Sequence, residues 1–98
     1  MSKTYVVIYS IGPGWLTGKP LEEQPLQEHG DYLHLLYKEG ILIEGGPYLD
    51  DSGALLLIRA EDLDEAWDIV EHDPAVLDEI FVPEVHPWFQ GDWANYGG

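Results

Sequence analysis

The chain has 98 residues, 45% of them hydrophobic, which is enough for one domain with a buried core and too few for a second. Nineteen carboxylates oppose four lysines and arginines, so the formal net charge is −15 and nucleic acid or an anionic membrane would be repelled as a partner. There is no cysteine, which excludes disulfides, thiolate metal sites and a cysteine nucleophile. Neutral, weakly acidic or cationic small molecules remain as ligands.

No stretch of the sequence reaches the length needed to span a membrane, and the first residues lack the apolar segment of a signal peptide. We therefore expect a cytoplasmic protein. The expected domain covers residues 1–98, and residues 91–98 are expected to form a flexible tail because the end of the chain shows no hydrophobic periodicity.

The first predicted strand covers residues 5–9, a run of β-branched and aromatic residues that ends at Gly12-Pro13-Gly14. Residues 11–24 then form a long connection rich in glycine and proline, which is typical of a lid or a partner contact. Trp15 within it could equally cover an edge of the core.

A first helix is expected to begin near Pro25, whose fixed φ suits a first helical turn, and to end at Gly40 as a left-handed cap. Residues 41–47 and 54–58 read as two strands joined through a turn at 50–53 into a hairpin. Asp62 is the expected N-cap of a second helix that extends to about Glu71.

After Asp73-Pro74 and a short turn over residues 75–78, a last strand is predicted to begin at residues 80–82. Pro83 and Pro87 confine this strand to an edge of the sheet or to interruptions, because proline cannot donate to a strand ladder.

The order βαββαβ predicts a ferredoxin-like α+β fold: a four-stranded antiparallel sheet with both helices on one face. The strands are apolar on both faces, as in Leu55 to Ile58, yet two helices can cover only one face. We therefore expect a homodimer in which two sheets pack face to face, the alternative being that the loop and the tail cover the second face.

His29 is the main candidate for a functional residue. At 100° per residue, Leu26, Leu33, Leu36 and Tyr37 fall in one apolar stripe of the first helix, and His29 lies inside it. An imidazole in that position needs a polar partner, and Asp73, held before Pro74 at the exit of the second helix, offers a carboxylate.

A carboxylate that accepts from one imidazole nitrogen fixes the tautomer and leaves the other nitrogen free to remove a proton from a substrate. A His29–Asp73 dyad without a nucleophile suits elimination, isomerisation or tautomerisation. The structural alternative is a core histidine whose partner only caps local backbone. No serine is placed for a triad.

The four histidines do not predict a metal site. His29 and His34 lie about 140° apart on the helix and cannot share an ion. A site built from His29, Asp73 and His86 is conceivable, but no ligand spacing supports it. We expect neither a metal nor a cofactor.

Tyr5, Tyr9, Gly46, Pro47 and Trp88 are the expected substrate-binding residues. Tyr5 and Tyr9 share a face of the first strand, so two phenols could lie near the dyad. Gly46 and Pro47 let backbone approach a ligand, although a strand bulge explains them equally well. Trp88 could wall the pocket, or belong to an aromatic core or a dimer contact.

Several short motifs occur in a recognisable order. They are His29 with Tyr32-Leu33, Gly40-Ile41-Leu42, Gly46-Pro47, Gly53, Asp64-Glu65-Ala66, Asp73-Pro74 and Val85-His86-Pro87-Trp88. With these motifs the chain resembles the YCII-related (YciI-like) proteins of the dimeric α+β barrel superfamily. The resemblance implies a ferredoxin-like protomer, dimers formed through the sheets, and a pocket between sheet and helices with His29 and Asp73 as its polar pair.

One branch of that family is tied to lyase chemistry on chlorinated hydroxyquinols. The family often has an arginine ahead of the helix histidine, whereas this chain has Leu21-Glu22-Glu23-Gln24, which argues against a role in holding an anionic substrate.

The preferred interpretation is a small cofactor-independent enzyme, a lyase or isomerase acting on a small cyclic or aromatic compound through His29 and Asp73. The alternative is a non-catalytic module that binds a small ligand in the same pocket or serves as an accessory domain. A purely structural role is the third possibility.

Overall fold

The order of helices and strands is the predicted one in the computed structural model, which describes residues 2–97. Met1 and Gly98, which belong to the predicted domain and tail, lie outside the described residues. The elements are β1 (Lys3–Ile11), α1 (Gln27–Lys38), β2 (Leu42–Pro47), β3 (Gly53–Ala60), α2 (Leu63–Glu71), α3 (Pro74–Leu77) and β4 (Phe81–Pro87), with 3₁₀ turns at Leu21–Glu23 and Trp93–Asn95.

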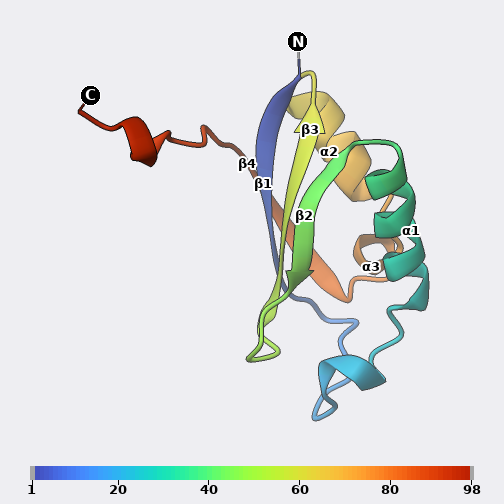
Figure 1. Cartoon of the computed structure of the whole chain (residues 1–98). Helices are drawn as coiled ribbons and strands as arrows, with labels where there is room; N and C mark the ends of the chain where they lie inside the picture. Colours follow the sequence, from blue (N-terminus) through green and yellow to red (C-terminus); the bar gives the residue numbers. More distant parts are fainter. Residues whose placement is uncertain (1, 98) are drawn as a thin grey trace.

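The four strands form one antiparallel sheet in the order β2-β3-β1-β4, the ferredoxin-like arrangement expected from the sequence. The helices lie on one side of this sheet, and the C-terminal tail projects on the other (Figure 1). Strand β4 lies at the edge of the sheet and pairs with β1 alone, so Pro83 and Pro87, which lack a backbone N–H, interrupt no second ladder. The edge position predicted for this strand is confirmed.

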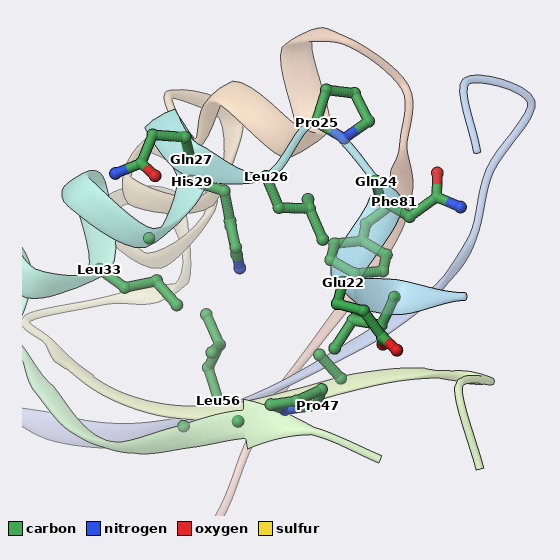
Figure 2. Close-up of a pocket in the computed structure, with 15 residues that line it drawn as sticks. Glu22, Gln24, Pro25, Leu26, Gln27, His29, Leu33, Pro47, Leu56 and Phe81 are labelled. Atoms are coloured by element: carbon green, nitrogen blue, oxygen red, sulfur yellow. The ribbon is translucent and has the colours of Figure 1, made fainter. Parts of the chain in front are cut away.

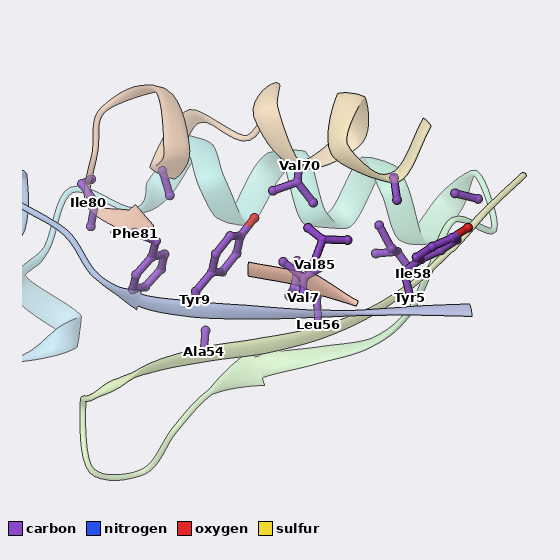
Figure 3. Close-up of a cluster of buried hydrophobic side chains, with 13 residues drawn as sticks. Tyr5, Val7, Tyr9, Ala54, Leu56, Ile58, Val70, Ile80, Phe81 and Val85 are labelled. Carbon is purple, nitrogen blue, oxygen red and sulfur yellow. The ribbon is translucent and has the colours of Figure 1, made fainter. Parts of the chain in front are cut away.

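Strand alternation decides which side chains meet the helices. Tyr5, Val7 and Tyr9 of β1 face the helices and are at most 2% exposed (Figure 3). Leu56 and Ile58 of β3 join them in the core. The intervening side chains point to the opposite face, where no helix covers them, and are only half-buried: Val6, Ile8, Leu55 and Leu57.

Helix α1 begins at Gln27, two residues later than expected, because Pro25 and Leu26 are still outside helical geometry. It ends as predicted: Gly40 follows it with φ 78°, a left-handed conformation that glycine adopts without strain. The apolar stripe is narrower than expected, since Leu36 is buried whereas Tyr37, one position on, is 63% exposed.

Capping by aspartate shapes the second half of the chain. Asp62 accepts a hydrogen bond of 2.8 Å from the Glu65 backbone N–H and starts α2, as predicted. The expected turn over residues 75–78 begins instead as helix α3, because Asp73 caps it and Pro74 supplies a helical φ at its first position. None of the described helices is long and apolar enough to cross a membrane.

Candidate functional site

His29 and Asp73 are 44 residues apart in the chain and form a buried pair. Nδ1 of His29 lies 2.8 Å from each oxygen of the Asp73 carboxylate. Asp73 is fully buried and His29 is 9% exposed. The structure therefore brings together the two residues that the sequence singled out, the first from the first turn of α1 and the second from the start of α3.

Two further donors hold the Asp73 carboxylate. The Tyr9 hydroxyl donates to Oδ2 over 2.7 Å, and the Ala75 backbone N–H donates to Oδ1 over 2.9 Å. The carboxylate thus accepts from β1 through Tyr9, from α1 through His29 and from α3 through Ala75. A carboxylate oxygen accepts, so His29 Nδ1 is the donor in this pair, and in the neutral ring the lone pair is then on Nε2.

Tyr9 keeps its phenol proton and donates it in a hydrogen bond to Asp73. Burial raises the pKa of its phenol well above the ordinary value, and the Asp73 charge and hydrogen bond raise that pKa further. The ring stacks on Phe81 with 5.2 Å between centroids, and both rings meet the edge of His29 at 6.0 and 5.7 Å. This packing restricts the plane of the imidazole.

A cavity of about 580 Å³ opens beside the histidine. Figure 2 shows the His29 ring pointing into the space between Leu26, Leu33 and Leu56. Its walls come from the segment before α1, from α1 itself and from the facing strands: Leu21, Glu22, Gln24, Pro25, Leu26, Gln27, His29, Gly30, Leu33, Gly45, Gly46, Pro47, Ala54, Leu56 and Phe81. The walls are largely apolar, and Gly46 and Pro47, singled out from the sequence, are among them.

Of the expected substrate-binding residues, Tyr5, Tyr9 and Trp88 do not line the cavity. Tyr9 lies buried behind the dyad, where its hydroxyl donates to Asp73. Tyr5 precedes Tyr9 by four residues on the same strand, which places it about 13 Å away in the core. Trp88 pairs with the start of β1, where its backbone N–H donates to the Thr4 carbonyl. It borders a separate hollow at that end of the sheet, lined by Lys3, Thr4, Pro87, Trp88, Phe89 and Gln90.

Gln24 is a site residue that the sequence did not reveal. It is 7% exposed; its Oε1 accepts from the Leu16 N–H, and its Nε2 donates to the carbonyls of Leu16, Lys19 and Pro20. One buried amide thus holds the residue 11–24 segment as a wall of the cavity. A single glutamine beside a proline carries no sequence signal for this role.

The histidines do not converge on a metal site. His86 lies on the opposite face of the sheet from the dyad and its Nε2 is 2.5 Å from Glu84. Among residues 2–97, no three histidines or acidic residues are grouped so that they could hold a metal ion.

The comparisons with known proteins agree with this architecture. One similar solved structure is 5-chloro-2-hydroxyhydroquinone dehydrochlorinase (TftG) from Burkholderia phenoliruptrix AC1100, in complex with 2,5-dihydroxybenzoquinone. It matches with a TM-score of 0.71 and 26% identity, over 90% of this chain and 95% of that chain. No curated protein sequence matches the chain.

The model of the YCII-related domain matches residues 4–89, which run from the start of β1 to just beyond β4. This range includes the three α-helices and the four strands, except for the first residue of β1. The chain therefore belongs to the YCII-related family.

Proposed function

We propose that this protein is a small-molecule enzyme, a lyase or isomerase, in which His29 is the general base and Asp73 its orienting partner. One observation carries the proposal: His29 is bonded through Nδ1 to a buried carboxylate while its ring points into a cavity of about 580 Å³. A cavity of that size accommodates a single-ring compound.

In the proposed reaction, Nε2 of His29 removes a proton from a carbon or hydroxyl of the bound ring. The electron pair left on the ring then expels chloride from a chlorinated ring, which completes the loss of hydrogen chloride, or in an isomerisation takes up the proton at another ring atom. The imidazolium that forms lies 2.8 Å from the Asp73 carboxylate, which stabilises its charge. Tyr9 and Ala75 keep that carboxylate in place, so little reorganisation accompanies proton transfer. Leu33, Leu56 and Phe81 limit the access of water to the ligand.

TftG supports the chemical class. Its name describes the removal of hydrogen chloride from a chlorinated hydroxyhydroquinone, and the solved complex holds a dihydroxybenzoquinone. Dehydrochlorination needs a base, and the His29–Asp73 pair is suited to that role. We propose a small polyhydroxylated ring, the class of compound that the name of TftG gives as its substrate, as the ligand of this chain.

The test is turnover of 5-chloro-2-hydroxyhydroquinone, followed by chloride release and by absorbance of the quinone product. His29→Ala should lower kcat at least about 100-fold, the usual scale for removing a general base, while ligand affinity changes by a small factor. His34→Ala, on the exposed side of the same helix, is the matched control. Binding by the wild type without turnover of this or related ring compounds would favour the alternative, a non-catalytic binding module.

We further propose that the protein works as a homodimer through the sheet face opposite the helices. Half-buried apolar side chains of β1 and β3 line this face, and none of the helices formed by residues 2–97 covers it. A second copy of the same face would remove these side chains from water.

A further inference from the structure

We propose that Glu22 makes the cavity selective against anionic ligands, so that the site takes uncharged ring compounds bearing hydroxyl groups. The inference deepens the proposed function because it concerns the same cavity, but it depends on ligand binding and not on turnover. It rests on the charges and hydrogen-bonding groups that line the cavity.

The described residues that line the cavity include a carboxylate but no lysine or arginine. Glu22 is the sole carboxylate among these described residues. The chain's four cationic side chains are Lys3, Lys19, Lys38 and Arg59, and all of them lie elsewhere and are exposed. A carboxylate or phosphate entering the cavity would meet Glu22 with no lysine or arginine to offset the repulsion.

The hydrogen-bonding side chains of the cavity favour a ligand that donates. Nε2 of His29 and the Glu22 carboxylate are acceptors. Both ends of the Gln24 amide are engaged by the residue 11–24 backbone, and the Gln27 amide nitrogen already donates to Asp31. Hydroxyl groups can donate to the free acceptors, whereas a carboxylate at neutral pH cannot.

The position of Glu22 limits the size of its effect. It belongs to the 3₁₀ turn Leu21–Glu23, borders the cavity and is exposed to solvent (Figure 2). Charges at such a position are partly screened by water. We therefore expect a change of several-fold to tenfold in relative affinity, not the loss of all binding.

The test measures binding of two nearly isosteric probes to the full chain by calorimetry at low salt: 2,5-dihydroxybenzamide, which is neutral, and 2,5-dihydroxybenzoate, which is anionic. The wild type should bind the benzamide about tenfold or more tightly than the benzoate. Glu22→Lys should reduce this preference at least about fivefold, because it replaces a repulsive charge with an attractive one. Glu28→Lys is the control: it makes the same change of net charge at a nearby exposed position that does not line the cavity, so the preference should change less than about twofold.

Three results would overturn the inference: equal affinity of the wild type for both probes, equal effects of the two lysine variants, or no binding of the benzamide at millimolar concentration. The turnover experiment with His29→Ala fails or succeeds independently. A wild type that discriminates by charge but catalyses nothing refutes the proposed enzyme and leaves the selectivity standing. A wild type that catalyses turnover but binds both probes equally refutes the selectivity and leaves the proposed enzyme standing.

Discussion

Asp73 performs two tasks with one carboxylate. Oδ1 accepts from the Ala75 N–H and so caps α3, and both oxygens lie within hydrogen-bond distance of His29 Nδ1. Oδ2 accepts from Tyr9 as well. Burying a charge is costly unless several donors compensate it, and here each donor comes from a different element. The dyad is therefore part of what holds β1, α1 and α3 together.

Removing the imidazole should destabilise the fold because the carboxylate remains buried with fewer donors. We expect His29→Leu to lower the free energy of unfolding by roughly 3 kcal/mol, the scale for breaking a buried pair from one side. Urea denaturation measures this loss. His34→Leu, at an exposed position of the same helix, should stay within about 0.5 kcal/mol of the wild type. Equal or greater stability of His29→Leu would contradict the stabilising role given to the pair.

Tyr9 should make the fold sensitive to alkaline pH. Its pKa is raised by burial in the folded protein, so the folded state keeps the phenol proton above pH 10, where an unfolded tyrosine loses it. The free energy of unfolding should then fall as pH rises above about 10, by up to about 1.4 kcal/mol per pH unit from this residue. Tyr9→Phe should be less stable at pH 7, where it lacks the bond to Asp73, but should lose stability less steeply above pH 10.

Urea denaturation between pH 8 and 11.5 tests this dependence. Tyr37→Phe is the control because Tyr37 is 63% exposed, and its removal should leave the slope unchanged. Parallel slopes for the wild type and Tyr9→Phe would mean that Tyr9 ionises normally in the folded protein.

At the scale of elements, the residue 11–24 segment contributes a wall of the cavity without regular strand or long helix. The backbone N–H groups of Gly12 and Gly14 donate to the carbonyls of Ile80 and Glu79, which ties one end of the segment to the start of β4. Gln24 ties the other end. The ring centroids of Trp15 and Phe81 lie 6.1 Å apart, and Trp15 packs against an edge of the hydrophobic core. This is one of the two roles considered for it.

Replacing Gln24 should loosen this wall. Gln24→Ala leaves the Leu16 N–H and three carbonyls without their partner, which should cost about 1–3 kcal/mol of stability. The segment should become susceptible to limited proteolysis, and affinity for cavity ligands should fall. Gln27→Ala, which removes one exposed hydrogen bond to Asp31, serves as the control for stability and proteolysis only, because Gln27 itself lines the cavity. Unchanged cleavage of residues 11–24 in Gln24→Ala would contradict the role given to this amide.

At the scale of the whole molecule, the helices protect one face of the sheet and leave the other with an apolar centre. Across that face, β-sheet register places Leu57 opposite Val6 and Leu55 opposite Ile8. On β4 the same rows continue into Glu84 and His86, so the uncovered face has an apolar middle and a polar edge. This distribution suits an interface with a polar rim.

The proposed dimer predicts a molecular mass twice that of one chain in light scattering. Leu57→Lys places a charge in the middle of the uncovered face and should give a monomer, because burying an unpaired ammonium is unfavourable. Leu77→Lys, at a leucine that is 66% exposed on α3, should leave the mass unchanged. A monomeric wild type would refute the proposal.

The sequence by itself determined the succession of elements and several of their ends. The apolar runs of β1 and β3, the left-handed Gly40 and the Asp62 cap depend on local backbone preferences and side-chain spacing, which can be recognised without knowing the contacts between distant segments. His29 stood out for the same reason, as a polar residue in an apolar stripe. Asp73 was recognisable through Pro74 and the family resemblance.

Tertiary structure alone decided what surrounds the dyad. Tyr5 and Tyr9 are equivalent by alternation, and only the placement of Asp73 within hydrogen-bond distance of the Tyr9 hydroxyl selects Tyr9 as its partner. Trp88 lies at the other end of the sheet because β4 runs antiparallel to β1. Gln24 enters the cavity wall through bonds to a segment without periodicity. These placements depend on register and on contacts between segments far apart in the chain, which no local pattern specifies.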